Sequence, residues 1–240
     1  MEGRLIIVGT GIQLNHLTLE AKNAMENAKK LLYLVPDAVT ESYIKKLNES
    51  AENMFRFYEE GKERQQTYNE IIDYIIKVLL EQKDLCVAFY GHPGVFTYPS
   101  HKSIILAKEL GYEAKMLPGI STEDMIFSEL GIDPGNYGLQ SFEATSFLLQ
   151  QYKFDERCYL ILWQVGVLGL RKYVQNINIK SELDKLEKML LKTYPKEHEI
   201  ILYQGSGLRI IESTIIYTQL QKLHSTKFDP ISTMVIRPLI

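Results

Sequence analysis

The sequence predicts an α/β protein made of two halves. Short apolar runs alternate with longer amphipathic segments along the chain, which is the pattern of β-strands connected by helices. The length of 240 residues exceeds the roughly 150 that are typical of one domain, and a break falls at Leu117-Pro118-Gly119. We therefore expect mostly parallel sheets, in an N-terminal α/β half over residues 1–117 and a C-terminal α/β half over residues 118–240.

Six apolar runs are predicted as strands because they are too short and too uniformly apolar to be surface helices. In chain order they are Leu5–Val8, Leu31–Leu34, Leu85–Phe89, Tyr159–Trp163, Ile200–Tyr203 and Met234–Ile236.

The segments between these runs carry apolar residues at helical spacing. The clearest is Gln66–Leu80, where one stripe is formed by Ile71, Ile72, Ile75, Ile76, Leu79 and Leu80. Further helices are predicted over Thr18–Ala28, Ser100–Leu110, Ser121–Leu130 and Ser181–Leu191. Ser121 is a predicted N-cap, because it precedes the acidic residues Glu123 and Asp124, which favour the positive end of a helix.

Charge and cysteine content narrow the class of protein. The net charge is −3 with no basic cluster longer than two residues, which disfavours a nucleic-acid or anionic-membrane partner. The sequence shows neither a secretory signal nor an apolar stretch close to the ~20 residues that span a bilayer. Cys86 and Cys158 are too few for a disulfide framework and are expected to be buried free thiols in a reducing compartment. We therefore expect a soluble, cytoplasmic protein.

The segment Phe89–Phe96 is the most specific candidate site. It follows a predicted strand, at the carboxyl edge where α/β sheets bind ligands, and its glycines and proline fix an irregular backbone. The same residues are also good turn formers, but an ordinary turn does not need Tyr90 and His92 beside it. The earlier Gly9-Thr10-Gly11 lacks the third glycine of a dinucleotide loop and indicates a tight turn near a ligand.

A second candidate site is weaker. Arg64 and Tyr68 lie four residues apart on one face of a predicted helix, and a guanidinium beside a phenol favours the phenolate, which is the better base. Taken alone, such a pair more often means an arginine in solvent and a tyrosine in the core. The five histidines have no metal-ligand spacing, and neither a Gly-x-Ser-x-Gly elbow nor a Walker loop is present.

Together these motifs resemble the tetrapyrrole-methylase superfamily, and within it the borosin-type enzymes, over nearly the whole chain. The resemblance lies in Val8–Leu14, Arg64–Tyr68, Tyr90–Phe96, Pro118–Ser121, Leu130–Gly135, Gln140–Ala144, Leu162–Gln164 and Pro230–Thr233. Other branches, which act on precorrins, ribosomal RNA or diphthamide, typically carry an acidic residue at the position of His92, so His92 and the Arg64/Tyr68 pair indicate the peptide branch. The resemblance implies S-adenosylmethionine in a cleft between two α/β halves. It also implies methylation of backbone amides in a ribosomally made peptide, with S-adenosylhomocysteine as the product.

The resemblance also implies which residues form the site. The expected catalytic residues are Arg64, Tyr68, Tyr90 and Tyr58. The expected cofactor-binding residues are Tyr90, His92, Val95, Phe96, Ser121, Thr122, Gln164, Gly205, Ser232 and Thr233, and no metal is implied.

Partners follow from the same resemblance. Family members are homodimers, so a homodimer is implied here, with the tyrosine-rich stretch 52–80 as a candidate contact surface. Fungal-type enzymes carry their substrate as a C-terminal extension, whereas only Arg237–Ile240 follow the last predicted strand. We therefore expect a separate precursor peptide, as in the split bacterial arrangement, in which two enzyme chains and two precursors would form a heterotetramer.

An amide nitrogen is a poor nucleophile because its lone pair is delocalised into the carbonyl group. We expect Tyr68, beside Arg64, to remove the N–H proton while Arg64 or Tyr58 stabilises the oxyanion, and Tyr90 to align the methyl group. Two alternatives stay open. One is a small-molecule or tetrapyrrole methyltransferase of the same superfamily, and the other is a catalytically silent protein that binds cofactor and peptide.

Overall fold

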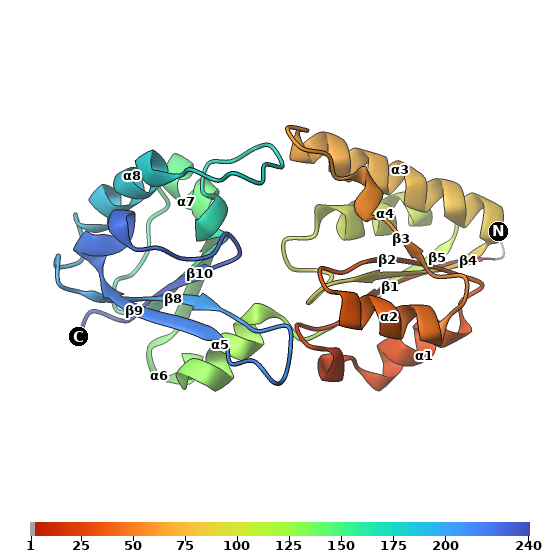
Figure 1. Ribbon diagram of the computed structural model, residues 1–240, viewed down its shortest axis with the longest axis horizontal. Helices are drawn as coiled ribbons and strands as arrows, with labels where there is room; N and C mark the ends of the chain where they lie inside the picture. The colour runs from red at the N-terminus through yellow and green to blue at the C-terminus, as the bar shows by residue number, and fades with distance from the viewer. Residues whose placement is uncertain (1–2) are drawn as a thin grey trace. The chain divides into compact units, whose positions relative to one another are not determined.

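The computed structural model describes residues 3–240, which divide into two compact units (Figure 1). The first unit runs to Met125 and also includes the short segment Gly207–Ile211 from later in the chain. The second unit consists of Ile126–Ser206 and Glu212–Ile240. This division lies a few residues beyond the boundary predicted after Leu117. The predicted domain boundary stays a prediction.

The first unit is built on a fully parallel sheet in the order β3-β2-β4-β1-β5. Its strands are β1 (Arg4–Gly9), β2 (Lys30–Leu34), β3 (Glu52–Asn53), β4 (Asp84–Phe89) and β5 (Glu113–Leu117). The connections are η1 (Leu14–His16), α1 (Leu19–Asn27), α2 (Ala38–Leu47), η2 (Phe55–Phe57), α3 (Arg64–Gln82) and α4 (Tyr98–Glu109).

Alternating side chains of the central strands fill two cores. Figure 1 shows α3 and α4 on one face of the first sheet and α1 and α2 on the other. Leu5 and Ile7 of β1 belong to the core with α3 and α4, whereas Ile6 and Val8 belong to the core with α1 and α2. Burial on both faces explains why the strand reads as uniformly apolar. Of the predicted stripe of α3, four residues are buried (Ile71, Ile72, Ile75 and Leu79), Ile76 is half-buried, and Leu80 is exposed.

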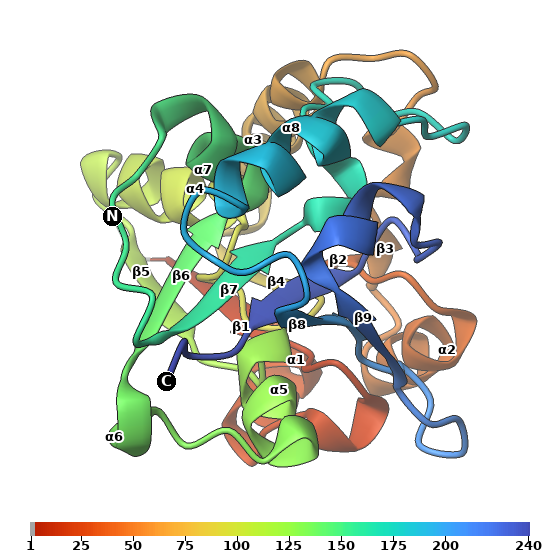
Figure 2. The ribbon, with the colours of Figure 1, turned by 90° about the vertical axis from the view of Figure 1, so that its left-hand side faces the viewer.

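The second unit contains a mixed sheet in the order β6-β7-β10-β8-β9 (Figure 2). Its strands are β6 (Leu139–Glu143), β7 (Tyr159–Trp163), β8 (Glu199–Gln204), β9 (Thr214–Gln219) and β10 (Thr233–Ile236). The remaining elements are α5 (Thr122–Leu130), α6 (Pro134–Tyr137), α7 (Ala144–Gln150), η3 (Val165–Val167), α8 (Lys180–Leu190) and η4 (Leu220–Ser225), of which α5 begins in the first unit. A single large core joins α7, α8 and η4 to one face of this sheet.

The expectation of mostly parallel sheets is confirmed for the first sheet and wrong for the second. Only β6 and β7 pair in parallel there, whereas β10 runs antiparallel to both β7 and β8, and β8 runs antiparallel to β9. All six predicted strands and five predicted helices are present. The sequence analysis missed β3, β5, β6, β9, α2, α6 and α7.

Two smaller expectations can be compared with the structure. Both cysteines are free thiols, with Cys86 buried as expected, but Cys158 is only half-buried. Burial raises the pKa of Cys86 to about 12. In residues 3–240, no helix combines the length and apolar character needed to cross a membrane.

Candidate active site

The loop after β4 is held by a close crossing of three glycine backbones. A β-carbon on Gly9 would collide with the carbonyl oxygen of Gly91, and it would lie 3.0 Å from the α-carbon of Gly119. Gly11 and Gly91 exchange backbone hydrogen bonds of 3.2 and 3.0 Å. The Gly9-Thr10-Gly11 turn is therefore packed directly against the Tyr90–Phe96 segment, near the carboxyl ends of β1, β4 and β5.

Two histidines hold the peptide groups of Gly94. Gly94 N–H donates to His92 Nδ1 at 2.9 Å, and the Gly94 carbonyl oxygen lies 2.9 Å from His101 Nε2 on α4. Since His92 Nδ1 accepts, its Nε2 carries the proton of the neutral ring. Two residues further on, Phe96 has a φ of 51°, a left-handed conformation that is rare outside glycine and is concentrated at functional sites.

A pocket of about 270 Å³ lies beside this loop, within the first unit. It is lined by Leu34, Val35, Pro36, Phe55, Tyr58, Tyr68, Phe89, Tyr90, Phe96, Thr97 and Pro99. None of these side chains is charged, so the polar groups available to a ligand are hydroxyl groups and backbone groups. A small, largely apolar pocket with a few hydroxyl groups is typical of a ligand site.

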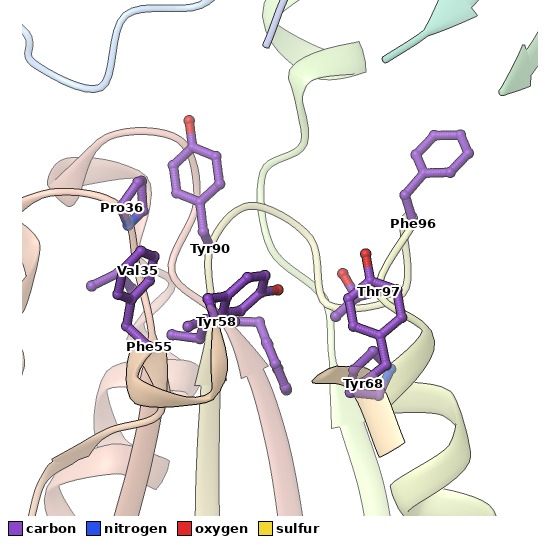
Figure 3. A pocket seen from close by; sticks show the side chains of 11 residues that line it. Val35, Pro36, Phe55, Tyr58, Tyr68, Tyr90, Phe96 and Thr97 are labelled. Carbon is purple, nitrogen blue, oxygen red and sulfur yellow. The ribbon is translucent and has the colours of Figure 1, made fainter. Parts of the chain in front are cut away.

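The pocket brings together three of the four predicted catalytic residues (Figure 3). Tyr58 directly follows η2 and stacks on Phe55 at 5.5 Å between ring centroids, with its hydroxyl group directed toward the side that carries Tyr68 and Thr97. Tyr68 comes from the second turn of α3. Tyr90 stands on the opposite side, and its hydroxyl group points away from the sheet.

Burial changes the pKa of the Tyr90 hydroxyl group. Burial and, to a smaller extent, the negative charge of Asp37 raise its pKa to about 12. Tyr90 therefore keeps its proton at neutral pH.

Arg64 is the one predicted catalytic residue that does not line the pocket. It is the first residue of α3, half-buried, and one helical turn before Tyr68. Within the described part of the chain no hydrogen bond joins the Arg64 guanidinium to the Tyr68 hydroxyl group. The helix thus places the pair as the spacing predicts, but the activation of Tyr68 by Arg64 stays a prediction.

The predicted cofactor residues of the first unit lie at the carboxyl ends of its strands. Tyr90, His92, Val95 and Phe96 follow β4, and Ser121 and Thr122 follow β5. The Ser121 hydroxyl group donates to Asp124 at 2.7 Å and accepts from the backbone N–H of Glu123 at 3.2 Å, which confirms the predicted cap of α5.

The four predicted cofactor residues of the second unit gather at one edge of its sheet. Gln164 and Gly205 come directly after β7 and β8, while Ser232 and Thr233 stand at the start of β10. Because β10 is antiparallel to β7 and β8, its first residues meet their carboxyl ends. Gln164 is left-handed, with a φ of 58°. The cofactor assignment itself stays a prediction.

Several pocket and loop residues were missed by the sequence analysis. Val35, Thr97 and Phe55 line the pocket, and His101 holds the loop from seven residues downstream of Gly94. Phe57 and Tyr74 of the stretch 52–80, the candidate subunit contact surface, are half-buried against the core of the first unit, and the contact surface itself stays a prediction. No motif marks these residues, since their roles depend on how strand ends meet.

Comparison with known proteins shows which family has this sequence. The family model "Tetrapyrrole (Corrin/Porphyrin) Methylases" matches residues 4–223. A methyltransferase/ribosomally synthesized cyclic peptide gymnopeptides precursor of Gymnopus fusipes is 36% identical over 98% of this chain and 57% of that protein. A methyltransferase/ribosomally synthesized type I borosin cyclic peptide precursor of Coprinopsis marcescibilis is 35% identical over 98% of this chain and 62% of that protein.

Among solved structures, uroporphyrin-III C-methyltransferase from Thermus thermophilus, complexed with S-adenosylhomocysteine, has the same fold. Its TM-score is 0.65 at 14% identity, covering 98% of this chain and 92% of that one. The present chain spans little more than half the length of the two curated relatives. It belongs to the tetrapyrrole methylase family, and the borosin resemblance of its motifs is confirmed.

Proposed function

We propose that this chain transfers a methyl group from S-adenosylmethionine to backbone amide nitrogens of a ribosomally made peptide. The observation that carries the proposal is the pocket in which Tyr58, Tyr68 and Tyr90 meet without a charged neighbour in the lining. An apolar peptide can enter such a pocket, and its amide group finds only phenolic and backbone partners there.

The residues at the two sheet edges fit the cofactor. An adenosyl group needs an apolar surface and backbone hydrogen-bonding groups. Val95 and Phe96 offer exposed apolar side chains directly beside the glycine crossing. Tyr90, His92, Ser121 and Thr122 complete the predicted cofactor contacts at the edge of the first unit, and Gln164, Gly205, Ser232 and Thr233 are the predicted contacts at the edge of the second unit. When bound, S-adenosylmethionine supplies an electrophilic methyl group on a positively charged sulfur.

The side chains of the pocket divide the remaining work. Tyr68 takes the amide proton, because Tyr90 with its raised pKa cannot serve as the base at neutral pH. Tyr58 donates a hydrogen bond to the carbonyl oxygen, on which negative charge develops as the proton leaves, and Arg64 adds its positive charge from one turn away. Tyr90 orients the reacting groups as a neutral donor. The apolar lining keeps water from competing for the proton.

The test combines mass spectrometry with one conservative variant. The full chain, S-adenosylmethionine and a short synthetic peptide of valine, isoleucine and glycine are incubated, and mass increments of one methyl group are counted. We expect increments located on backbone amides, and a loss of roughly 10²- to 10⁴-fold in kcat for Tyr68→Phe, which keeps the ring and removes the proton acceptor.

The control is Tyr98→Phe, which should leave kcat unchanged. The Tyr98 ring is a neighbour of the Tyr68 ring, with 6.4 Å between the ring centroids, but Tyr98 does not line the pocket. Unchanged kcat in Tyr68→Phe would show that another group is the base. Cofactor binding without any increment on the peptide would instead support a silent binding protein. Methylation of a tetrapyrrole but not of the peptide would support the other branch of the superfamily.

The relatives are fused precursors, so their arrangement leaves open how the peptide reaches the site here. We propose that the chain accepts a peptide supplied as a separate molecule and acts as a homodimer. Methylation of the synthetic peptide tests the first part, and sedimentation with and without the peptide tests the second.

A further inference from the structure

One lysine joins the segment that carries Tyr58 to the helix that carries Arg64 and Tyr68. Lys62 Nζ donates a hydrogen bond of 3.0 Å to the carbonyl oxygen of Phe57, the residue before Tyr58. The same ammonium group binds the Glu70 carboxylate on α3, and it forms an ion pair of 3.5 Å with Glu59. The three acceptors match the three N–H donors of an ammonium group.

The Lys62 side chain is largely buried between the segment that carries Tyr58 and α3. It is only 9% exposed, which is uncommon for a lysine. Glu70 receives a second hydrogen bond, of 3.0 Å, from Gln66 on the preceding turn of α3, so the carboxylate that holds Lys62 is itself fixed.

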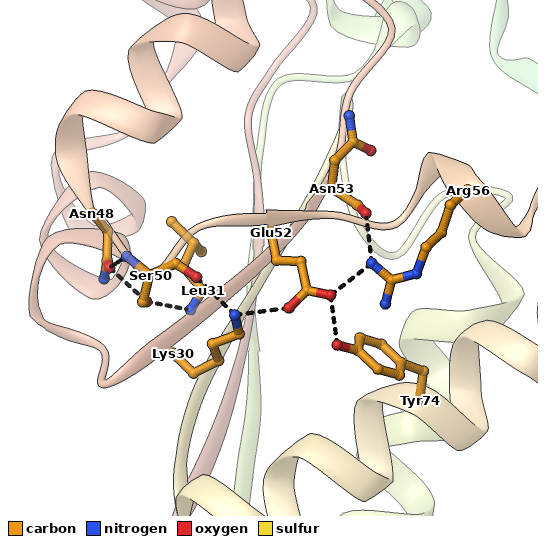
Figure 4. Close-up of polar contacts among 8 residues, drawn as sticks. All are labelled: Lys30, Leu31, Asn48, Ser50, Glu52, Asn53, Arg56 and Tyr74. Atoms are coloured by element: carbon orange, nitrogen blue, oxygen red, sulfur yellow. Dashed lines mark hydrogen bonds and ion pairs between the residues drawn. The ribbon is translucent and has the colours of Figure 1, made fainter.

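A second polar connection holds the start of the same segment. Glu52 Oε1 accepts hydrogen bonds of 2.6 Å from Tyr74 on α3 and from Arg56 of η2 (Figure 4). Glu52 Oε2 pairs with Lys30 at 2.8 Å. The segment from 52 to 62 is thus joined to α3 at two places, Tyr74 and Glu70.

Met54, Phe57 and Tyr58 of this segment pack against the core of the first unit, but the turn that follows Tyr58 is exposed. Phe55 is 50% exposed, and Glu59 and Glu60 are exposed. Gly61 is left-handed and a β-carbon there would contact nothing within 4 Å. The exposed turn at residues 59–61 has conformational freedom that the hydrogen bond and ion pairs of Lys62 restrict.

We propose that Lys62 is a positioning residue that sets the hydroxyl group of Tyr58 against the pocket face formed by Tyr68. This inference rests on the proposed function, because it assigns Lys62 a role in the same reaction. Lys62 does not line the pocket and acts only through the backbone carbonyl of Phe57 and the carboxylate of Glu70. Both connections are lost if the ammonium group is replaced by an apolar end.

The experiment compares Lys62→Met with Lys77→Met in the full chain. Both remove an ammonium group and keep a similar chain length, but Lys77 is an exposed residue of the same helix. We expect Lys62→Met to lower kcat roughly 10- to 100-fold, as a misplaced catalytic group does, with little change in the affinity for S-adenosylhomocysteine. Lys77→Met should match the unaltered protein.

A double-mutant cycle with Tyr58→Phe separates positioning from general damage. If Lys62 acts through the Tyr58 hydroxyl group, Lys62→Met should lower kcat in the normal background but hardly at all in Tyr58→Phe. Lys62→Arg should recover part of the rate, because it can reach the Glu70 carboxylate with a different donor geometry. Equal losses in both backgrounds, or a kcat within twofold of normal in Lys62→Met, would overturn the inference.

Amide hydrogen exchange makes the result independent of activity. Lys62→Met should speed exchange in residues 55–62 and leave β4 and α8 unchanged, even if no methylation is found in the unaltered protein. In that case the proposed function fails while the mechanical role of Lys62 is still tested. Unchanged exchange in 55–62 would remove the basis of the inference whether or not the chain methylates peptides.

Discussion

At the scale of single residues, the tyrosines of the pocket differ by their surroundings. Tyr90 has its pKa raised to about 12 by burial, so it keeps its proton at neutral pH. Tyr58 is stacked on the half-exposed Phe55, and Tyr68 leans on Tyr98. Burial thus suits Tyr90 to the part of a neutral donor in the proposed reaction.

At Gly9, the addition of a single methyl group should destabilise the fold. A β-carbon there would overlap the Gly91 carbonyl oxygen and lie 2.7 Å from Pro93 Cδ. Neither neighbour can move without shifting the loop that carries Tyr90. We expect Gly9→Ala to lower the free energy of unfolding by about 1–3 kcal/mol, measured by urea denaturation followed by circular dichroism.

Gly207→Ala is the matched control, because a β-carbon at Gly207 would lie an ordinary 3.7 Å from the Ile12 carbonyl oxygen. Its stability should stay within about 0.5 kcal/mol of the unaltered protein. Equal stability of the two variants would mean that the glycine crossing is looser than the structure shows.

Motif matching could predict the residues of this site that belong to a continuous segment. Tyr90 and His92 follow a recognisable strand, and Arg64 and Tyr68 share a helix face whatever the rest of the fold does. Val35 and His101 could not be predicted in this way. They reach the site because β2 lies beside β4 and because α4 folds back over the loop, which is a matter of tertiary structure.

At the scale of elements, apolar strands were predictable and their partners were not. The six strands predicted from uniformly apolar runs are present because each lies inside a sheet and is buried on both faces or nearly so. β5 and β9 were missed, since they alternate with polar or exposed residues and lie at sheet edges. The prediction of parallel strands in the second sheet was wrong because a uniformly apolar run has the same pattern in a parallel and in an antiparallel strand.

The connection between η2 and α3 predicts a dependence of stability on pH. Burial alone would raise the pKa of Glu52, but hydrogen bonds from Lys30, Tyr74 and Arg56 outweigh it and lower the pKa to about 2. A carboxylate with a depressed pKa stabilises the folded state above its ordinary pKa of 4.5. This contribution is lost as the pH falls from there toward 2.

We expect Glu52→Gln to flatten the fall in stability between about pH 5 and pH 2 by 1–3 kcal/mol, measured by denaturant titrations at each pH. Glu113→Gln is a suitable control, because Glu113 is an exposed residue at the start of the edge strand β5. If Glu52→Gln and the unaltered protein lost stability in parallel through this range, the hydrogen-bonded carboxylate would not be a determinant of acid stability.

At the scale of the whole molecule, each unit has its own sheet, its own buried hydrophobic residues and its own sheet edge with predicted cofactor residues. Six of these residues belong to the first unit and four to the second. Folding of either unit alone cannot assemble the full set. If one cofactor molecule is held by both edges, its binding must therefore protect both units at once.

Hydrogen exchange with S-adenosylhomocysteine tests this requirement. Slower exchange is expected in residues 90–96 and 121–122 and equally in residues 164–166, 204–206 and 232–233, with α8 unchanged. At a free ligand concentration of about 100 times Kd, the linked stabilisation should be about 2.7 kcal/mol. Protection confined to the first edge would assign the cofactor to one unit and remove Gln164, Gly205, Ser232 and Thr233 from the site.

Gln164→Asn sharpens the same test, because asparagine tolerates the left-handed backbone that Gln164 adopts but has a shorter side chain. Gln151→Asn is its control, since Gln151 is also left-handed, with a φ of 50°, but is exposed at the end of α7 and is not a predicted cofactor residue. If the Gln164 amide contacts the cofactor, only the first variant should weaken S-adenosylhomocysteine binding, by roughly tenfold for one lost hydrogen bond. Equal affinities would show that the strained backbone at Gln164 serves the fold of the second unit and not the ligand.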